Sequence, residues 1–166
     1  MEQMTLWPHQ AAELAVLRDK TARYVPWGMR VGKTALAIAA ARQWGSRRTL
    51  VLCPKSVISV WQEQYATWDQ ETYVLALDGN KPLAKKASTA RMALSYLSCR
   101  TAIIINYEAC WRGEMAKVLT GQQWDVVVAD ESHRIKAVSG RASRFIATLR
   151  AIYRLGLSGT PFPQSP

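Results

Sequence analysis

A short loop early in the chain carries residue types that can grip phosphate. The stretch Gly28-Met-Arg-Val-Gly32-Lys33-Thr34 follows a short β-type segment and opens an alanine-rich helical pattern. A glycine before a helix lets the main chain approach a phosphate, and the first amides of the helix point at the anion. Lys33 supplies a mobile charge for the β- and γ-phosphates, and the Thr34 hydroxyl can complete a magnesium shell. This context predicts a nucleotide-binding loop, although three residues separate its glycines where the strict pattern has four.

A second candidate site lies where a run of valines ends in two carboxylates. The stretch Val126-Val-Val-Ala-Asp130-Glu131-Ser132-His133 is typical of a buried strand followed by an acidic turn. In P-loop nucleotide hydrolases the acid at such a strand end holds magnesium, and a neighbouring group orients the attacking water. Asp130 is placed for the metal and Glu131 for polarising water. An acidic turn that only closes a strand is the alternative, and the phosphate loop upstream favours catalysis by Lys33, Asp130 and Glu131.

The elements that must position these residues alternate along the chain. Short β-branched segments alternate with longer helical patterns, which predicts an α/β fold with a parallel sheet and helices on both faces. The expected strands span residues 23–25, 49–53, 73–77, 102–106, 126–130 and 154–158. The expected helices span residues 8–18, 33–44, 57–67, 82–97, 111–120 and 141–152. Ligands of open α/β sheets bind beyond the carboxyl ends of the strands, so the polar residues there are the candidates for function.

Length, composition and charge narrow the class of protein. The 166 residues suffice for one domain, and 49% hydrophobic with 20% charged residues is typical of a soluble globular protein. The net charge of +10 favours a polyanionic partner, nucleic acid before an anionic membrane surface. Cys53, Cys99 and Cys110 lack the spacing of a zinc site and fit reduced thiols. With no signal peptide and no apolar run long enough to span a bilayer, we expect a soluble intracellular protein without a membrane partner.

Taken in order, six segments resemble the motifs of superfamily 2 helicase-like ATPases, and those of the Swi/Snf branch most closely. The segments are Leu6-Trp7-Pro8-His9-Gln10, Met29-Arg30-Val31-Gly32-Lys33-Thr34, Leu50-Val-Leu-Cys-Pro54-Lys55-Ser56-Val-Ile-Ser-Val-Trp61, Ile105-Asn106-Tyr107-Glu108, Asp130-Glu-Ser-His133-Arg134-Ile135-Lys136 and Leu157-Ser158-Gly159-Thr160-Pro161. That family also lacks the strict first glycine, so the resemblance accounts for the irregular spacing of the phosphate loop. Arg30 stands where the family usually has glycine and adds charge near the phosphates.

This resemblance implies a RecA-like P-loop NTPase domain, a single N-terminal one over residues 1–166, with ATP and Mg²⁺ as cofactors. It implies that Gln10 reads the adenine and that magnesium is held by Thr34 and Asp130. The nucleotide-binding residues would be Gln10, Met29, Arg30, Val31, Gly32, Lys33 and Thr34. The residues for DNA contact or its coupling to ATP hydrolysis would be Lys55, Ser56, Asn106, Tyr107, His133, Arg134, Lys136, Ser158 and Thr160.

Helicase-like motors place ATP between two RecA-like lobes, and nothing in this sequence resembles the second lobe. We therefore expect the ATP-binding lobe of a DNA-dependent ATPase or translocase, with low turnover when alone. Its expected partners are DNA, duplex rather than single-stranded, and a second lobe in the full-length protein or a separate chain. The Met-Arg-x-Gly-Lys-Thr loop resembles those of small phage and bacterial proteins, which predicts a prokaryotic or phage-encoded protein in the host cytoplasm.

Two other functions remain open on the sequence. The first is a non-catalytic interaction module that keeps the fold and uses nucleotide only as a switch. Against it stand Lys33, Thr34, Asp130 and Glu131, which such a module would be free to lose. The second is a P-loop kinase, against which stand the Asp-Glu-Ser-His strand end, the Ser-Gly-Thr-Pro segment and the lack of an arginine-rich lid.

Overall fold

The computed structural model of the protein describes residues 5–96, 98–133 and 139–159. Within these residues, six strands form one parallel sheet in the order β1-β6-β5-β2-β4-β3. The strands are β1 (Ala22–Val25), β2 (Arg48–Cys53), β3 (Thr72–Ala76), β4 (Arg100–Asn106), β5 (Gln123–Ala129) and β6 (Arg150–Leu157). The helices are α1 (Pro8–Leu17), α2 (Lys33–Gln43), the 3₁₀ turn η1 (Lys55–Val57), α3 (Ile58–Trp68), α4 (Leu83–Ser95), α5 (Tyr107–Cys110), α6 (Gly113–Thr120) and α8 (Ser139–Thr148).

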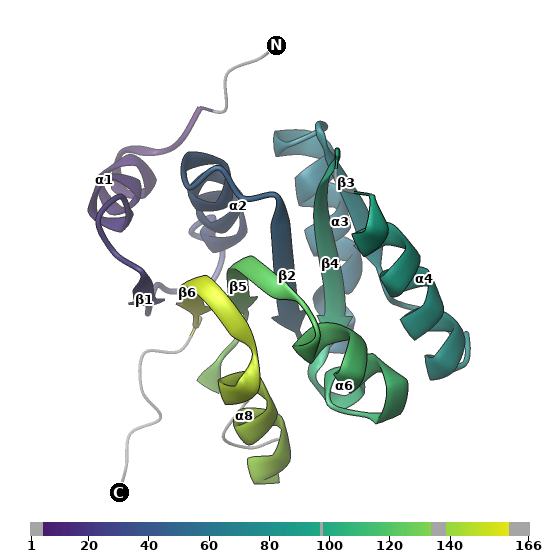
Figure 1. The fold of residues 1–166 in the computed structure, drawn as a ribbon. Helices are drawn as coiled ribbons and strands as arrows, with labels where there is room; N and C mark the ends of the chain where they lie inside the picture. The colour runs from purple at the N-terminus through teal and green to yellow at the C-terminus, as the bar shows by residue number, and fades with distance from the viewer. Residues whose placement is uncertain (1–4, 97, 134–138, 160–166) are drawn as a thin grey trace, which may run out of the picture.

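Helices cover both faces of the sheet (Figure 1), because the central strands are apolar on both sides. The residues of β2 point alternately to the two faces of the sheet. Val51 and Cys53 pack in a core with α1, α2 and α3. Leu50 and Leu52 join the other core, which is closed by α4, α5, α6 and α8. The predicted α/β class, with a parallel sheet between two helical layers, is confirmed. Among the described residues, no helix has the length and apolar character needed to cross a membrane.

The boundaries of three predicted elements are wrong. The helix expected over residues 141–152 ends at Thr148, and β6 begins at Arg150 instead of residue 154. Pairing with β5 decides this boundary, because Arg150 lies opposite Gln123 in the parallel ladder. The helix expected over residues 111–120 begins two residues later, at Gly113, whose φ of 49° lies outside the α-helical region; the separate short helix α5 precedes it.

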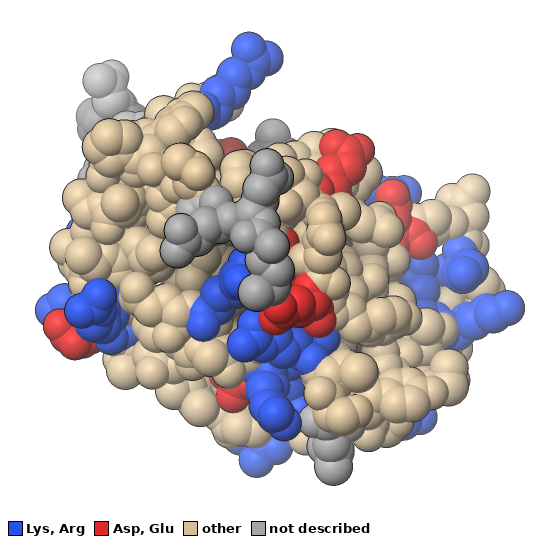
Figure 2. Space-filling model, turned by 90° about the horizontal axis from the view of Figure 1, so that it is seen from above, with Lys and Arg blue, Asp and Glu red and all other residues tan. Residues whose placement is uncertain are grey.

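Part of the basic charge supports the fold. Arginines donate to main-chain carbonyls at the ends of helices in the pairs Arg42 with Trp68, Arg48 with Leu94, Arg150 with Gly121, and Arg154 with Leu149. Such bonds satisfy carbonyls that the helix leaves unpaired and place positive charge at the negative end of its dipole. Figure 2, seen from above Figure 1, shows Lys and Arg gathered near the middle of that face. The net charge alone therefore does not locate a binding site.

Candidate functional site

The loop between β1 and α2 is shaped by a glycine. Gly32 is the N-cap of α2 with a φ of 76°, a left-handed conformation that favours glycine. The buried Gln10 side chain lies against it and donates from Nε2 to the Gly32 carbonyl at 3.0 Å. Its Oε1 accepts from the main-chain N–H of Trp7 at 2.7 Å, which caps the start of α1. A methyl group on Gly32 would overlap with the Gln10 amide nitrogen, so a side chain there would displace Gln10.

Lys33, the first residue of α2, is only 9% exposed, and the helix that follows it is anchored in the core by Leu36 and Ile38. Its Nζ donates to the carbonyls of Gly28 at 2.6 Å and Trp27 at 3.2 Å, so the ammonium group lies within the loop. A lysine in the first turn of a helix, whose first amides are unpaired, is a combination that binds anions. The geometry is therefore that of a phosphate-binding loop.

Asp130 follows β5 and is 8% exposed, with both carboxylate oxygens in hydrogen bonds. Oδ2 accepts from the indole Nε1 of Trp61 at 2.8 Å, and Oδ1 accepts from the main-chain N–H of Glu131 at 2.9 Å. Burial raises the pKa of Asp130 above its ordinary value, with a further rise from the charge of Glu131, while the Trp61 bond and the charge of Lys33 oppose the shift.

The loop after β6 lies against both the acidic turn that follows β5 and the phosphate loop. The main-chain N–H of Gly159 donates to Oε2 of Glu131 at 3.1 Å. A methyl group on Gly159 would lie 3.1 Å from Glu131 Oε1 and 3.3 Å from Met29 Cγ, so the acidic turn and the phosphate loop flank this glycine. His133 Nδ1 lies 3.3 Å from Glu131 Oε2 and 3.0 Å from Ser158 Oγ. The structure thus brings the predicted phosphate loop and acidic strand end to one site.

The residues of this site suit magnesium that is shared with a nucleotide. No cluster of three or more His, Cys, Asp or Glu side chains that could hold a metal occurs in the described part of the chain. Thr34, half-buried in the first turn of α2, and Asp130 offer one hydroxyl and one carboxylate. Mg²⁺ in phosphate-handling sites takes few protein ligands and completes its octahedron with phosphate oxygens and water. The donor set therefore fits Mg²⁺ bound with phosphates.

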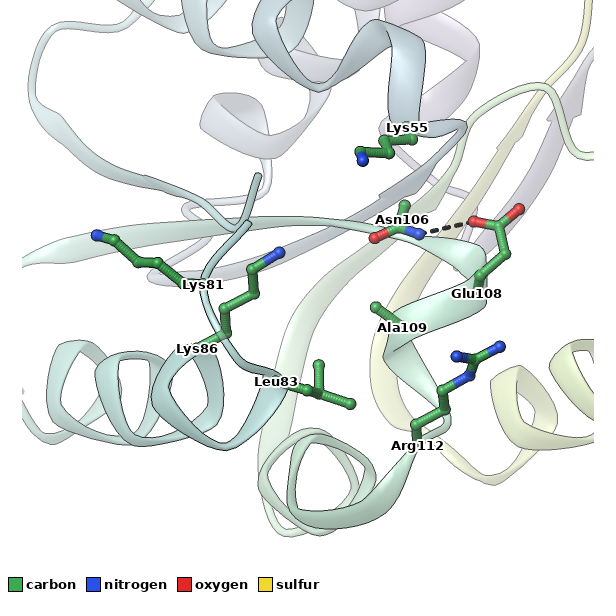
Figure 3. Close-up of a pocket in the computed structure, with 8 residues that line it drawn as sticks. All are labelled: Lys55, Lys81, Leu83, Lys86, Asn106, Glu108, Ala109 and Arg112. Atoms are coloured by element: carbon green, nitrogen blue, oxygen red, sulfur yellow. Dashed lines mark hydrogen bonds between the residues drawn. The ribbon is translucent and has the colours of Figure 1, made fainter. Parts of the chain in front are cut away.

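A basic cleft of about 220 Å³ lies beyond the carboxyl ends of β2, β3 and β4 (Figure 3), and we call it the strand-end cleft. Its lining residues are Lys55, Lys81, Leu83, Lys86, Asn106, Glu108, Ala109 and Arg112. Asn106 Nδ2 donates to Glu108 Oε2 at 2.7 Å, and Lys86 Nζ donates to the Gly79 carbonyl at 2.9 Å. All the strands are parallel, so the cleft opens at the sheet edge that also carries the phosphate loop and Asp130.

Two residues of the expected set lie inside the protein: Tyr107, expected to contact DNA, and Ser158, expected to couple ATP hydrolysis to DNA contacts. Tyr107 is 1% exposed, and its hydroxyl donates to the main-chain carbonyl of Asp130 at 2.6 Å. The prediction that Tyr107 contacts the DNA backbone directly is therefore wrong for this conformation. Ser158 is fully buried beside His133. Lys55 and Ser56 are exposed on η1. The candidates Arg134, Lys136 and Thr160 lie outside the described residues.

The sequence reasoning missed several residues of the site. Lys81 and Lys86 follow β3, whose carboxyl end was not among the expected sites. Their position after a strand, shared with Lys55, is a signal that could have identified them. Arg112 was also missed, because it reaches the cleft from the break between α5 and α6. Trp61 is buried in the core, and its bond to Asp130 was not foreseen.

A parallel sheet with a Gly-Lys-Thr loop at a helix start and an Asp-Glu pair at a nearby strand end defines a RecA-like nucleotide-binding lobe. The family model described as the SNF2-related domain matches residues 17–166. The chain therefore belongs to the SNF2-related domain family, and the predicted Swi/Snf-type ATPase lobe is confirmed at the level of the family.

Individual relatives agree with this family. The chain is 30% identical over 142 residues to the mouse (Mus musculus) Chromodomain-helicase-DNA-binding protein 1-like, covering 82% of the chain and 15% of that protein. It is 32% identical over 113 residues to the ISWI chromatin-remodeling complex ATPase ISW2 of Saccharomyces cerevisiae, covering 68% of the chain and 10% of that protein. The SWI2/SNF2 ATPase core of Sulfolobus solfataricus in complex with dsDNA matches in fold, with a TM-score of 0.75 at 22% identity, over 96% of the chain and 33% of that structure's chain.

These comparisons correct one prediction. A prokaryotic or phage-encoded protein in the host cytoplasm was expected from the phosphate loop. The curated relatives are instead eukaryotic proteins named for chromatin remodelling, for a TATA-binding protein-associated factor and for DNA repair, which point to the nucleus. The loop resemblance was misleading because it rested on a few residues, whereas the relatives match over most of the chain.

Proposed function

We propose that the chain is the ATP-binding lobe of a DNA-stimulated ATPase that moves along duplex DNA, and that residues 1–166 act as a single lobe. The observation that carries this proposal is the meeting of the phosphate loop and the Asp130–Glu131 pair at the sheet edge that also holds the strand-end cleft. A solved structure of similar fold is described as an ATPase core in complex with dsDNA, which supports duplex DNA as the partner.

In the nucleotide site, the first helical amides of α2 and the Lys33 ammonium bind the β- and γ-phosphates. Binding requires Lys33 to exchange the carbonyls of Gly28 and Trp27 for phosphate oxygens. Gln10 borders the loop through its bond to Gly32, and we assign it to the adenine. Thr34 and Asp130 hold magnesium, which neutralises charge on the phosphates. Glu131 orients the attacking water once it leaves the Gly159 amide.

In the strand-end cleft, Lys55, Lys81, Lys86 and Arg112 bind the phosphate backbone of DNA. Contacts of this kind hold a duplex in place without reading its sequence. Their free energy comes largely from the release of counterions, so it falls steeply as salt is added. The exposed Ser56, next to Lys55 on η1, extends the same surface beside the cleft.

Rapid hydrolysis requires a second RecA-like lobe, because the arginines that stabilise the transition state come from it in motors of this type. Such an arginine increases turnover by roughly 10³–10⁵ in well-studied P-loop enzymes. The chain spans 15% of the mouse relative and 10% of the yeast relative, so these proteins contain much more than this lobe. The 166-residue chain should accordingly bind ATP–Mg²⁺ and hydrolyse it slowly.

Nucleotide binding and turnover by the chain and two variants test the site. Lys33→Ala should abolish binding of a fluorescent ATP analogue, because the cation over the α2 amides is lost. Glu131→Gln should bind the analogue like the parent and lose the slow hydrolysis that the parent retains. If both variants bind and hydrolyse ATP like the parent, the assignment is wrong. If the parent and Glu131→Gln share the same background hydrolysis, the chain is instead the nucleotide-switched interaction module.

Duplex DNA binding at several salt concentrations tests the strand-end cleft. Lys86 lines it and the adjacent Lys85 does not, so Lys86→Ala and Lys85→Ala remove the same charge from neighbouring positions. Lys86→Ala should weaken binding and reduce the slope of log K against log salt by about 0.9, the value expected for one phosphate contact. Lys85→Ala should leave the slope unchanged. Equal effects of the two variants, or binding that salt does not weaken, would exclude the cleft as the DNA site.

A further inference from the structure

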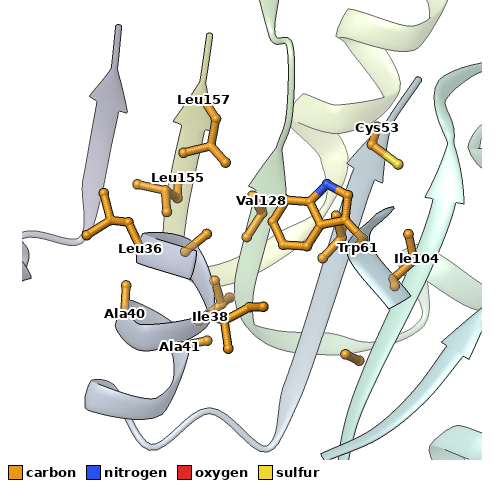
Figure 4. Close-up of a cluster of buried hydrophobic side chains, with 14 of the residues drawn as sticks. Leu36, Ile38, Ala40, Ala41, Cys53, Trp61, Ile104, Val128, Leu155 and Leu157 are labelled. Atoms are coloured by element: carbon orange, nitrogen blue, oxygen red, sulfur yellow. The ribbon is translucent and has the colours of Figure 1, made fainter. Parts of the chain in front are cut away.

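The indole of Trp61 makes a polar bond that filling the core does not require. Its ring is 1% exposed in the cluster that also contains Cys53, Ile104 and Val128 (Figure 4). The apolar part of the ring accounts for this packing. Its Nε1 nevertheless donates to Oδ2 of Asp130 at 2.8 Å, across a sequence separation of 69 residues. A phenylalanine would fill most of the same space, so the nitrogen calls for a separate explanation.

The other contacts of Asp130 show what this bond adds. The Glu131 main-chain N–H holds Oδ1, and the Tyr107 hydroxyl holds the main-chain carbonyl of Asp130. Those two bonds fix the backbone and one carboxylate oxygen. The Trp61 bond fixes the second oxygen and therefore the rotation of the carboxylate about its Cβ–Cγ bond. A metal ligand works best when its lone pairs already point at the metal.

We propose that Trp61 is a positioning residue for magnesium: its indole N–H sets the orientation in which the Asp130 carboxylate meets the metal. This inference rests on the proposed nucleotide site. Without the N–H group, Oδ2 of a buried carboxylate loses a charge-assisted bond, and among the described residues only the Glu131 N–H still restrains the carboxylate. Loss of a residue that orients a metal ligand typically lowers metal affinity by about 10–100-fold.

Trp124 provides a matched control for the loss of an indole donor. It is fully buried on β5, and its Nε1 donates to the Leu119 carbonyl at 2.9 Å, within the other core cluster. Trp61→Phe and Trp124→Phe therefore remove the same group and leave similar small cavities. A purely structural role for Trp61 predicts that the two variants differ only in thermal stability. A positioning role predicts a difference in their response to Mg²⁺.

The experiment measures binding of fluorescent ADP to the parent and both variants, first in EDTA and then with increasing Mg²⁺. In EDTA all three proteins should bind ADP alike, because Lys33 and the α2 amides are unchanged. Trp61→Phe should require an Mg²⁺ concentration about tenfold higher than the parent does to reach half of the Mg²⁺-dependent increase in ADP affinity. Trp124→Phe should match the parent. Equal Mg²⁺ requirements for Trp61→Phe and the parent would overturn the inference.

The failure of the proposed nucleotide site would be recognised separately. A parent that binds no ADP, or whose ADP affinity ignores Mg²⁺, would overturn that site and this inference with it. If Trp61→Phe does not fold, the parent still decides the question through the NMR signals of its indole N–H groups. The Trp61 signal should shift when Mg²⁺ joins bound ADP, and the Trp124 signal should not. A Trp61 signal that Mg²⁺ leaves in place would refute the positioning role.

Discussion

Replacing Gly32 with alanine should destabilise the whole lobe, because two separate costs coincide at this residue. Its φ of 76° lies in the left-handed region, which costs an L-residue about 1–2 kcal/mol. The new methyl group would also overlap with the Gln10 amide nitrogen and lie 3.3 Å from its Cδ. Gln10 would have to move, losing its bonds to the Gly32 carbonyl and the Trp7 N–H.

The size of the effect follows from these costs. Each of the two hydrogen bonds contributes about 0.5–1.5 kcal/mol, so strain and lost bonds together lower the free energy of unfolding by about 3 kcal/mol. In a domain of this size 1 kcal/mol shifts the melting temperature by about 2–4 °C. Gly32→Ala should therefore melt roughly 6–12 °C below the parent in differential scanning calorimetry.

Gly28 in the same loop is the control. A methyl group on Gly28 would meet no described atom within 4 Å, and no left-handed φ constrains this residue. Gly28→Ala should therefore melt within about 2 °C of the parent, as ordinary surface substitutions do. The reasoning would be refuted if Gly32→Ala melted as close to the parent as Gly28→Ala, or if both variants lost the same stability.

Three further properties can be measured on the chain. Burial raises the pKa of the Cys53 and Cys110 thiols to about 12, so only the exposed Cys99 among the three cysteines should react with Ellman's reagent until denaturant is added. Burial also raises the pKa of Tyr107 above its ordinary value, so the free energy of unfolding should fall as the pH rises above about 10, the pKa of tyrosine in the unfolded chain. Tyr107→Phe should reduce this fall, which urea titrations at several pH values would measure. Asp125→Ala should lower the free energy of unfolding by about 2 kcal/mol without changing ADP affinity, because its Oδ2 accepts two main-chain N–H groups at the start of β2, at 2.7 and 2.8 Å.

The sequence predicted the central strands well, because β2, β4 and β5 are short apolar runs that cannot form stable surface helices. It also predicted that Lys33 and Asp130 share one site, because both follow parallel strands and such strand ends lie at one edge of the sheet. The start of β6 was wrong because Arg150 and its neighbours resemble the end of a helix locally. Only pairing with β5, which sequence periodicity does not contain, makes them a strand.

The side-chain environment of the site could not be predicted in the same way. Tyr107 follows β4 and was expected to face DNA, yet it turns inward to the Asp130 carbonyl. Trp61 fits a helical apolar pattern, and periodicity says that such a ring is buried without saying where its nitrogen points. Both bonds join residues distant in sequence, so they depend on the strand order β5-β2-β4, which places the ends of these strands side by side.

The basic residues show why total charge is a weak guide to a binding surface. Arg48, Arg150 and Arg154 donate to carbonyls that helices leave unpaired, and a guanidinium suits this task because its donors form a rigid fork. Lys55 and Lys81 stand instead beyond strand ends around the strand-end cleft. An ammonium group on a flexible stem is a mobile point charge, which suits a phosphate backbone held without a fixed register. Whether a cation lies at a helix end or beyond a parallel strand therefore tells more about its role than the net charge of +10 does.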